Sequence, residues 1–280
     1  MTTQNTKSPC GPIGVFDSGY GGLTILNSIR SRLPQYDYLY LGDNARAPYG
    51  SRSFEVVYQY TLECVKKLFD MNCSLVILAC NTVSAKALRT IQQNDLPRMD
   101  PSRRVLGIIR PTVEVIGSLT TTRHVGLVGT MGTVNSNSYP LEIQKIYPDI
   151  TVAGEACPMW VPLVENGEYD TPGADYFVEK NLRSLFAADP KIDTLILGCT
   201  HYPLLEKTIR RHTPSNVSLV LQGDIVAESL ADYLVRHPEM DAKCSRGGSC
   251  RFLTTETPDK FAASASVFMS TQVTAEHLIL

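Results

Sequence analysis

Two cysteines in similar surroundings are the residues of this 280-residue chain that most suggest chemistry. Cys80 follows the apolar run LVILA and precedes Asn and Thr, whereas Cys199 follows LILG and precedes Thr and His. A single cysteine at the end of a strand is explained by packing, because cysteine is often buried and inert. Two cysteines in equivalent positions, about one α/β domain apart, indicate a shared function.

Two thiols that face each other across a substrate fit general acid–base catalysis. Nucleophilic catalysis needs one cysteine, a base and an oxyanion hole, so the second cysteine would be surplus. A pair of thiols can instead remove a proton from one face of a carbon and return a proton to the opposite face, which inverts a stereocentre. Because Cys80 is predicted to open a helix, we expect the helix dipole to lower the pKa of its thiol.

Two glycine-containing loops supply polar groups at the ends of predicted strands. In DSGYGG, Asp17 is placed to face an ammonium group, while Ser18 and the backbone N–H groups are placed to bind a carboxylate. The alternative is a tight turn in which Asp17 caps the following helix. In GDNARAPYG, Tyr49 and Gly50 offer a hydroxyl and N–H groups, although an ordinary surface loop is the equal alternative.

The residues that flank the cysteines form the remaining candidates. Asn81 and Thr82 can cap a helix or bind a substrate carboxylate. His201 can hydrogen-bond the substrate, shift the pKa of Cys199 or help to deliver a proton, and its alternative is a structural or capping histidine. Glu165 lies in CPMWVPLVENGE, a Pro/Gly-punctuated stretch that can lean over a cleft, and its alternative is a solvated loop carboxylate.

Alternating apolar runs and helical patterns must position these groups. The predicted strands are Ile13–Phe16, Tyr38–Leu41, Leu75–Ala79, Val105–Ile109, Val125–Val128, Thr151–Ala153, Thr194–Leu197 and Ser218–Leu221. The predicted helices are Leu23–Arg32, Ser53–Asp70, Thr82–Gln93, Asp175–Ala188, Pro203–Arg211, Ile225–Arg236 and Lys260–Met269. Runs that are apolar throughout favour parallel strands covered on both faces.

The fold class that follows is α/β, with two similar flavodoxin-like, doubly wound domains whose mainly parallel sheets face each other across a cleft. We expect residues 1–107 plus 217–280 to form the first domain, which carries Cys80. We expect residues 108–216 to form the second domain, which carries Cys199. Each cysteine then lies at the carboxyl end of a strand, where open α/β sheets bind ligands.

Composition excludes several classes of protein. The formal net charge of −2 gives no bulk attraction to nucleic acid or to an anionic membrane. No apolar run is long enough to span a bilayer, and the polar N-terminus predicts a frayed leader rather than a signal peptide. The cysteines form no CxxC pair, so no metal site is expected, and reduced thiols favour the cytoplasm. Cys244 and Cys250 are interpreted as surface thiols rather than as a metal or cross-linking pair.

Five ordered motifs together resemble the glutamate racemases of the aspartate/glutamate racemase superfamily. They are DSGYGG, GDNARAPYG, LACNT, GTMGTVNSNSY and LGCTHYPLL, and the similarity runs from about Ile13 to Arg236. The resemblance implies that Cys80 and Cys199 are the catalytic proton donors and acceptors. It implies that the substrate-binding pairs are Asp17–Ser18, Tyr49–Gly50, Asn81–Thr82 and Thr200–His201. It also implies that Asp17, Glu165 and His201 assist the thiols.

The same resemblance implies a biological role and a set of partners. The reaction would be the interconversion of L- and D-glutamate without a cofactor, and it would supply D-glutamate for peptidoglycan in the cytoplasm. The partners would be the small-molecule substrate glutamate and a second copy of the chain in a homodimer. No lysine stands in an obvious setting for a Schiff base, which disfavours a pyridoxal phosphate route. The segment QGDIVAESL, residues 222–230, departs from the motifs of the family.

Three alternatives to glutamate racemisation stay open. A sister enzyme could use the same two bases on aspartate or on a hydantoin. A catalytically silent module could bind an amino acid without exchanging its α-proton. A thiol hydrolase could use one cysteine as a nucleophile and form an acyl intermediate.

Overall fold

The computed structural model describes residues 10–269 and 271–280. Its strands are β1 (Ile13–Asp17), β2 (Tyr38–Gly42), β3 (Leu75–Leu78), β4 (Arg104–Gly107), β5 (His124–Gly129), β6 (Thr151–Ala156), β7 (Thr194–Gly198), β8 (Ser218–Val220), β9 (Cys250–Thr254) and β10 (Ala275–His277). Its helices are α1 (Gly22–Arg32), η1 (Asn44–Arg46), α2 (Phe54–Asp70), α3 (Asn81–Lys86), α4 (Leu88–Thr90), η2 (Ile91–Asp95), α5 (Leu96–Met99), α6 (Ile109–Leu119), α7 (Met131–Asn135), α8 (Ser138–Ile146), α9 (Trp160–Glu165), α10 (Pro172–Ala188), η3 (Tyr202–Leu205), α11 (Glu206–His212), α12 (Gln222–Arg236), α13 (Pro238–Asp241) and α14 (Pro258–Ala265).

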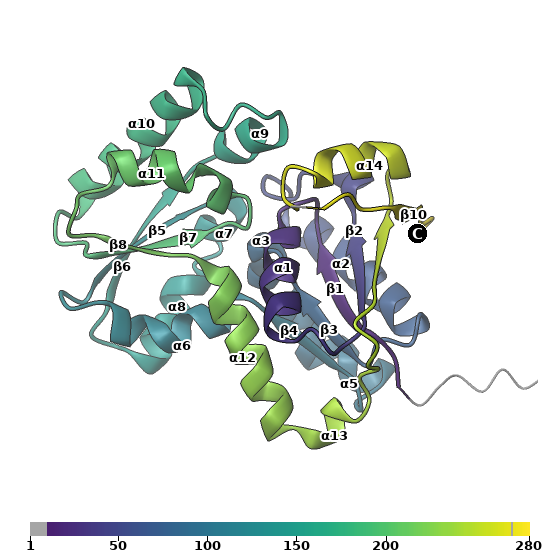
Figure 1. The fold of residues 1–280 in the computed structure, drawn as a ribbon. Coiled ribbons are helices and arrows are strands. Elements are labelled where there is room, and N and C mark those ends of the chain that lie inside the picture. The colour runs from purple at the N-terminus through teal and green to yellow at the C-terminus, as the bar shows by residue number, and fades with distance from the viewer. Residues whose placement is uncertain (1–9, 270) are drawn as a thin grey trace, which may run out of the picture.

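The strands form two separate sheets that lie side by side (Figure 1). The first sheet has the order β10-β9-β2-β1-β3-β4 and the second has the order β6-β5-β7-β8. All of the strand pairs described are parallel. Both sheets contain the same arrangement of four strands. It is β2-β1-β3-β4 in the first sheet and β6-β5-β7-β8 in the second. That order is flavodoxin-like, so the predicted α/β fold with two mainly parallel sheets is confirmed.

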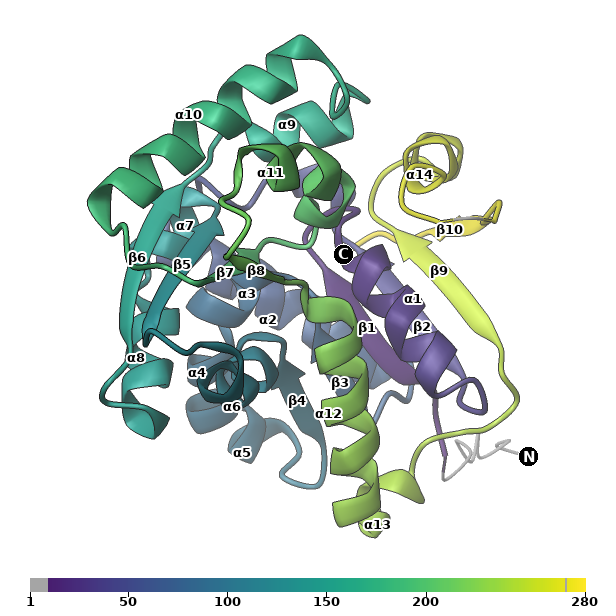
Figure 2. The same cartoon turned by 60° about the vertical axis from the view of Figure 1, so that its left-hand side comes forward.

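Both faces of each sheet are covered, as continuous apolar strands predict. In β1, Ile13 and Val15 join a core that also contains residues of α1, α12 and α14, whereas Phe16 points into the core beneath α2. The second sheet is divided in the same way between a core against α6 and α8 and a core against α10 and α11. Helix α12 lies along α1 and therefore connects the two halves (Figure 2).

The structure departs from several sequence-based predictions. The strand at Ser218–Val220, which the predicted boundaries assign to the first domain, pairs with β7 in the second sheet, and only α12 after it turns to α1. The predicted helix at 82–93 is divided into α3, α4 and the π-helical turn η2. The division at 107/108 and 216/217 stays a prediction. The predicted leader falls mainly on residues outside the described ranges.

The C-terminal segment is more regular than its composition indicates. Strand β9 pairs with β2, and β10 pairs with β9, so this segment completes the first sheet. Cys244 is buried and its thiol donates to the carbonyl of Met240, which corrects the interpretation of this residue as a surface thiol. Across the described ranges, no helix has the length and apolar character needed to cross a membrane.

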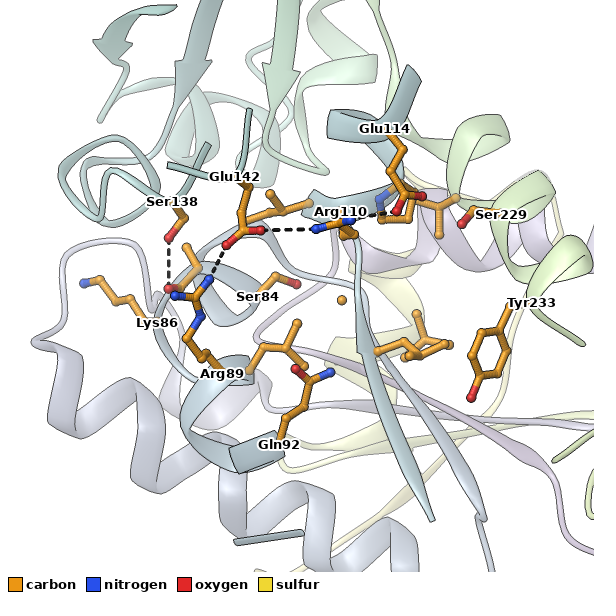
Figure 3. A pocket seen from close by; sticks show the side chains of 18 of the residues that line it. Ser84, Lys86, Arg89, Gln92, Arg110, Glu114, Ser138, Glu142, Ser229 and Tyr233 are labelled. Atoms are coloured by element: carbon orange, nitrogen blue, oxygen red, sulfur yellow. Dashed lines mark hydrogen bonds and ion pairs between the residues drawn. The ribbon is translucent and has the colours of Figure 1, made fainter. Parts of the chain in front are cut away.

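An ion-pair cluster joins the two halves away from the strand ends. Glu142 of α8 pairs with Arg89 of α4 and with Arg110 of α6 (Figure 3). It also pairs with Lys145 of its own helix. Glu142, Arg89 and Arg110 line a cavity of about 500 Å³ whose wall contains none of the predicted site residues. Although burial raises the pKa of Glu142, the hydrogen bond and charge of Lys145 and the charges of Arg89 and Arg110 lower it overall.

We expect Glu142→Gln to lower the free energy of unfolding at pH 7 by about 1–2 kcal/mol, because three cations lose a mostly buried partner. A depressed carboxyl pKa stabilises the fold above the unfolded value of 4.5, and this contribution is lost as the pH falls through the lower folded value. Urea titrations at pH 7 and at low pH measure the difference, which should vanish in acid. Glu114→Gln, which removes the exposed partner of Arg110, is the control and should have the smaller effect. Equal losses at both pH values would contradict this assignment.

Candidate functional site

A cavity of about 320 Å³ lies where the carboxyl ends of the two sheets meet. All of the site residues predicted from the sequence line it, namely Asp17, Ser18, Tyr49, Gly50, Cys80, Asn81, Thr82, Glu165, Cys199, Thr200 and His201. The structure therefore brings these residues together, although they come from five separate segments of the chain. Thr130, Met131, Cys157, Pro158, Val161 and Pro162 complete much of the remaining wall.

The topology explains why the two thiols share this cavity. Cys80 follows β3 and Cys199 follows β7, which are the third strands of the two repeated orders. In the first sheet β1 lies between β2 and β3, and in the second sheet β5 lies between β6 and β7. After adding a strand on one side of β1 or β5, the chain therefore adds the next strand on the other side. Ligand sites in open α/β sheets lie at such switch points. Each cysteine therefore occupies the switch point of its own sheet.

The DSGYGG loop folds around its own aspartate. The Oδ2 atom of Asp17 accepts hydrogen bonds from the backbone N–H groups of Gly19 at 3.2 Å and Gly22 at 3.0 Å, and from the Tyr40 hydroxyl at 3.3 Å. Burial raises the pKa of Asp17, and the N–H of Gly22 and the charge of His201 oppose that rise. These N–H groups are thus used by Asp17, so they are not available to a substrate carboxylate as the sequence interpretation expected.

Cys80 lies in surroundings that favour the neutral thiol. Its Sγ atom is 3.2 Å from the Ser18 hydroxyl and is buried at the start of α3. Burial, together with the negative charge of Asp17, raises the pKa of Cys80 to about 12, although Ser18 and the N–H of Val83 lower it. The expected fall in this pKa is therefore wrong. Desolvation outweighs the helix N-terminus because the thiolate would lose nearly all of its contact with water.

Cys199 lies next to a histidine whose ionisation is supported from both sides. The Nδ1 atom of His201 is 3.8 Å from the Cys199 sulfur, and its Nε2 atom is 3.0 Å from Oε1 of Glu165. Burial lowers the pKa of His201, but the hydrogen bonds and charges of Cys199 and Glu165 raise it to about 10. The imidazole is therefore a cation at neutral pH. It places a positive charge next to the Cys199 sulfur.

Close packing around His201 explains why position 21 of the DSGYGG loop is a glycine. A Cβ atom at Gly21 would lie 2.4 Å from Nδ1 of His201 and 2.4 Å from Oγ1 of Thr200. Only a residue without a side chain lets the first loop approach the second cysteine this closely. Thr200 is held further by the Thr24 hydroxyl of α1, which donates to its carbonyl at 3.0 Å.

Glu165 is positioned by a helix that sequence analysis missed. The segment interpreted as a punctuated loop contains α9, which ends at Glu165 itself. Trp160 at the start of this helix is fully buried, and its ring lies 4.8 Å from that of Tyr202 beside the second cysteine loop. Prolines on both sides of Trp160 hid the helix because proline usually interrupts one, whereas here Pro162 lies within the first turn.

The second predicted loop depends on a buried carboxylate. Asp43 is fully buried and accepts hydrogen bonds from the Tyr49 hydroxyl and from Arg46, which orients Tyr49 at the cavity wall. The carbonyl of Gly50 accepts a hydrogen bond from the N–H of Gly132 at 2.8 Å, so this loop is joined to the other half of the molecule. Asp43 was within the quoted motif, but its burial could not be read from the motif.

Thr130 is the clearest polar residue that sequence reasoning missed. Its hydroxyl is 2.9 Å from that of Thr82, and both line the cavity. Thr130 follows β5, and Asp17 is the last residue of β1, the strand in the equivalent position of the first sheet. Comparing the two repeated halves of the sequence could therefore have identified Thr130. In the part of the chain that the structure describes, no group of three or more His, Cys, Asp or Glu side chains is arranged to hold a metal ion.

The geometry assembles two thiols with opposite electrostatic surroundings in one cavity. One thiol is kept neutral beside a carboxylate, and the other lies beside an imidazolium. Such a pair can act as an acid and a base on the same substrate carbon. The surrounding amide, hydroxyl and cationic groups can bind an amino acid.

Comparison with known proteins yields one consistent family. The sequence profile described as Asp/Glu/Hydantoin racemase matches residues 23–230. A glutamate racemase from Ruegeria sp. strain TM1040 is 37% identical over 274 residues, which cover 94% of this chain and 98% of that protein. A crystal structure of a glutamate racemase isoform from Bacillus anthracis superposes with a TM-score of 0.88 at 32% identity, covering 98% of this chain and 99% of that chain. The glutamate racemase from Francisella tularensis in complex with D-glutamate has a TM-score of 0.86 at 32% identity, over 97% and 98% of the two chains.

We expect Glu165→Gln to lower the pKa of His201 from about 10 towards its ordinary value of 6.5, because burial would then lose one of the charged partners that oppose it. Imidazole NMR signals followed against pH measure the change. His212, which pairs with Asp175 outside the cavity, provides a reference imidazole signal in the same spectra. A His201 titration that stays the same in this variant would show that Glu165 does not stabilise the imidazolium.

Proposed function

The chain belongs to the Asp/Glu/Hydantoin racemase family, and from that premise we propose that it interconverts L- and D-glutamate with Cys80 and Cys199 as its two proton-transferring groups. The observation that supports this proposal best is that both thiols line one cavity at equivalent strand ends with opposite electrostatic surroundings. A racemase needs one base and one acid at the same time, one on each face of the α-carbon.

The proposed reaction begins with the ionisation states that the site favours. Cys199, beside the imidazolium of His201, acts as the thiolate and takes the α-proton, forming an S–H bond as the C–H bond breaks. Cys80, held as a thiol, gives its proton to the opposite face of the carbanion. The product leaves the two sulfurs with exchanged protonation states. The opposite enantiomer uses the same two sulfurs in the reverse order.

Glutamate offers charges that the lining residues complement. The α-ammonium is assigned to Asp17, whose carboxylate lines the cavity beside Cys80. The carboxylates are assigned to the hydroxyl, amide and N–H groups of Ser18, Asn81, Thr82, Thr200 and the Tyr49–Gly50 loop. Burial of the site strengthens these interactions because little water screens them, and this stabilises the charge that develops at the α-carbon.

Glutamate is preferred to aspartate because the relatives that match over nearly the whole chain are glutamate racemases. We propose that no organic cofactor takes part, since the two sulfurs supply both proton transfers. A role in supplying D-glutamate for peptidoglycan, a cytoplasmic location and a homodimeric state are further proposals, which rest on the family resemblance. The sister reaction on aspartate is the second candidate, and the same assay distinguishes it.

In heavy water without any added cofactor, we expect both L- and D-glutamate to exchange their α-proton for deuterium and to lose optical purity. Proton NMR and optical rotation measure the two processes in separate tubes for L-glutamate, D-glutamate and L-aspartate. Exchange with aspartate alone would favour the sister enzyme. Binding of glutamate without exchange in any tube would favour an amino-acid-binding module.

We expect Cys80→Ala and Cys199→Ala each to reduce racemisation by about 10²–10⁴-fold, the range that a general acid or base contributes. Cys250→Ser is the matched control, since this cysteine lies in β9 and outside the cavity. Rates of racemisation in both directions at several pH values measure the effect. For the unaltered protein a bell-shaped pH profile should result, because one sulfur must be ionised and the other protonated. Full turnover in either alanine variant would refute the two-thiol mechanism.

A further inference from the structure

A buried hydrogen-bonded triangle lies directly behind the first catalytic cysteine. Its corners are Asn81 of α3, Tyr139 of α8 and Gln222, the first residue of α12. The Nδ2 atom of Asn81 donates to Oε1 of Gln222 at 2.6 Å, and the Tyr139 hydroxyl donates to Oδ1 of Asn81 at 2.7 Å. The triangle closes because Nε2 of Gln222 donates to the Tyr139 hydroxyl at 2.7 Å. All three side chains are almost completely buried.

Gln222 comes from the segment that departs from the family motifs, and no role was assigned to it. Its position gives a physical reason to consider one. Among the predicted substrate-binding residues, Asn81 lines the cavity next to Cys80. Gln222 and Tyr139 do not line this cavity, yet they hold both ends of the Asn81 amide. Their direct hydrogen bonds to a residue of the cavity wall are those to Asn81.

A main-chain carbonyl determines the direction of the hydrogen bonds in the triangle, that is, which atom donates and which accepts. The Nε2 atom of Gln222 also donates to the carbonyl oxygen of Ile108 at 3.2 Å, and a carbonyl oxygen can only accept. Gln222 must therefore turn its nitrogen towards Ile108 and its oxygen towards Asn81. Asn81 in turn must present its nitrogen to Gln222 and its oxygen to the Tyr139 hydroxyl. Rotating the Asn81 amide by half a turn would place its oxygen against the oxygen of Gln222, two acceptors with no proton between them, and would turn its nitrogen towards the Tyr139 hydroxyl.

This constraint leaves one useful donor at the cavity. The Nδ2 atom of Asn81 has two N–H groups, and one of them is used by Gln222. Within residues 10–269 and 271–280, the second N–H has no acceptor. Because the amide cannot rotate, this N–H stays available to an anionic group of the substrate. Burial raises the pKa of Tyr139, so its hydroxyl remains neutral and able to donate.

We propose that Gln222 is a positioning residue, which together with Tyr139 fixes the Asn81 amide so that its free N–H donates to a carboxylate of the substrate. This inference rests on the proposed racemase function. The triangle joins α3, which follows the first sheet, to α8 and α12, which follow strands of the second sheet. It thereby holds the Cys80 loop in register with the half of the molecule that carries Cys199.

The test compares Gln222→Met and Tyr139→Phe with the unaltered protein. Both changes keep the volume of a buried side chain but release one end of the Asn81 amide. We expect each to raise KM for L- and D-glutamate about tenfold, which corresponds to roughly 1.4 kcal/mol for a misdirected hydrogen bond to a charged group. We expect kcat to change by less than about twofold, because neither residue contacts the reacting atoms.

A double-mutant cycle separates positioning from a merely structural role. In an Asn81→Ala background, Gln222→Met should cause no additional rise in KM, since no amide remains to be oriented. Thr112→Val is the matched control. It removes a hydroxyl that lies 2.9 Å from Nε2 of Gln222 and competes with Ile108 and Tyr139 for the two N–H groups of that atom, so both remaining acceptors stay paired and KM should be unchanged. Melting temperatures of all variants report any loss of stability separately.

The outcomes distinguish the inference from the proposed function. Racemisation by the unaltered protein with an unchanged KM in both Gln222→Met and Tyr139→Phe would overturn the positioning role alone. Additive rises in KM in the Asn81→Ala background would overturn it as well. If the unaltered protein neither racemises glutamate nor binds it by calorimetry, the proposed function fails and the positioning role fails with it.

Discussion

Cys80 and Cys199 share one cavity because the carboxyl ends of two parallel sheets meet there, and much of the molecule serves this arrangement. Parallel strands end on the same edge of a sheet, so each sheet delivers its loops in one direction. The order in which the first strand separates the second from the third then opens a crevice at that edge. Because the order is repeated, Cys80 and Cys199 occupy corresponding crevices and face the same space.

The symmetry of the backbone is broken by the side chains around the two sulfurs. Beside Cys80 lie a buried carboxylate and a hydroxyl, and the pKa of the thiol rises to about 12. Beside Cys199 lies His201, whose pKa rises to about 10 with the support of Glu165. An identical pair of surroundings would favour the same protonation state on both sulfurs. The difference between them is what the proposed acid–base pair requires.

Polar contacts, rather than apolar packing alone, hold the two halves in register at the cavity. The N–H of Gly132 bonds to the carbonyl of Gly50, and the hydroxyls of Thr82 and Thr130 bond to each other. Behind them lies the triangle that Gln222 completes. Hydrogen bonds are directional, so they define the relative position of the two halves more narrowly than apolar contacts can. The ion pairs of Glu142 add a further connection on another face of the same boundary.

The sequence by itself determined the positions of strands β1 to β8, the α/β class and many of the residues that line the cavity. Continuous apolar runs identify parallel strands, and polar residues that follow them must lie at one edge, so local information was sufficient. It was insufficient for β9 and β10, whose apolar character is weak and whose place depends on pairing with β2. It was also insufficient for α9, because the prolines there concealed a short helix that the burial of Trp160 stabilises.

Only the tertiary structure decided the electrostatics and the supports of the site. A helix N-terminus predicts a lowered pKa for Cys80, but burial and Asp17 come from distant segments and reverse the direction. Gln222 shows no local signal, because its partners Asn81 and Tyr139 are remote in the chain. Composition and spacing identify which groups are present. Desolvation and hydrogen-bond direction arise from neighbours that only folding brings together, and they determine what those groups do.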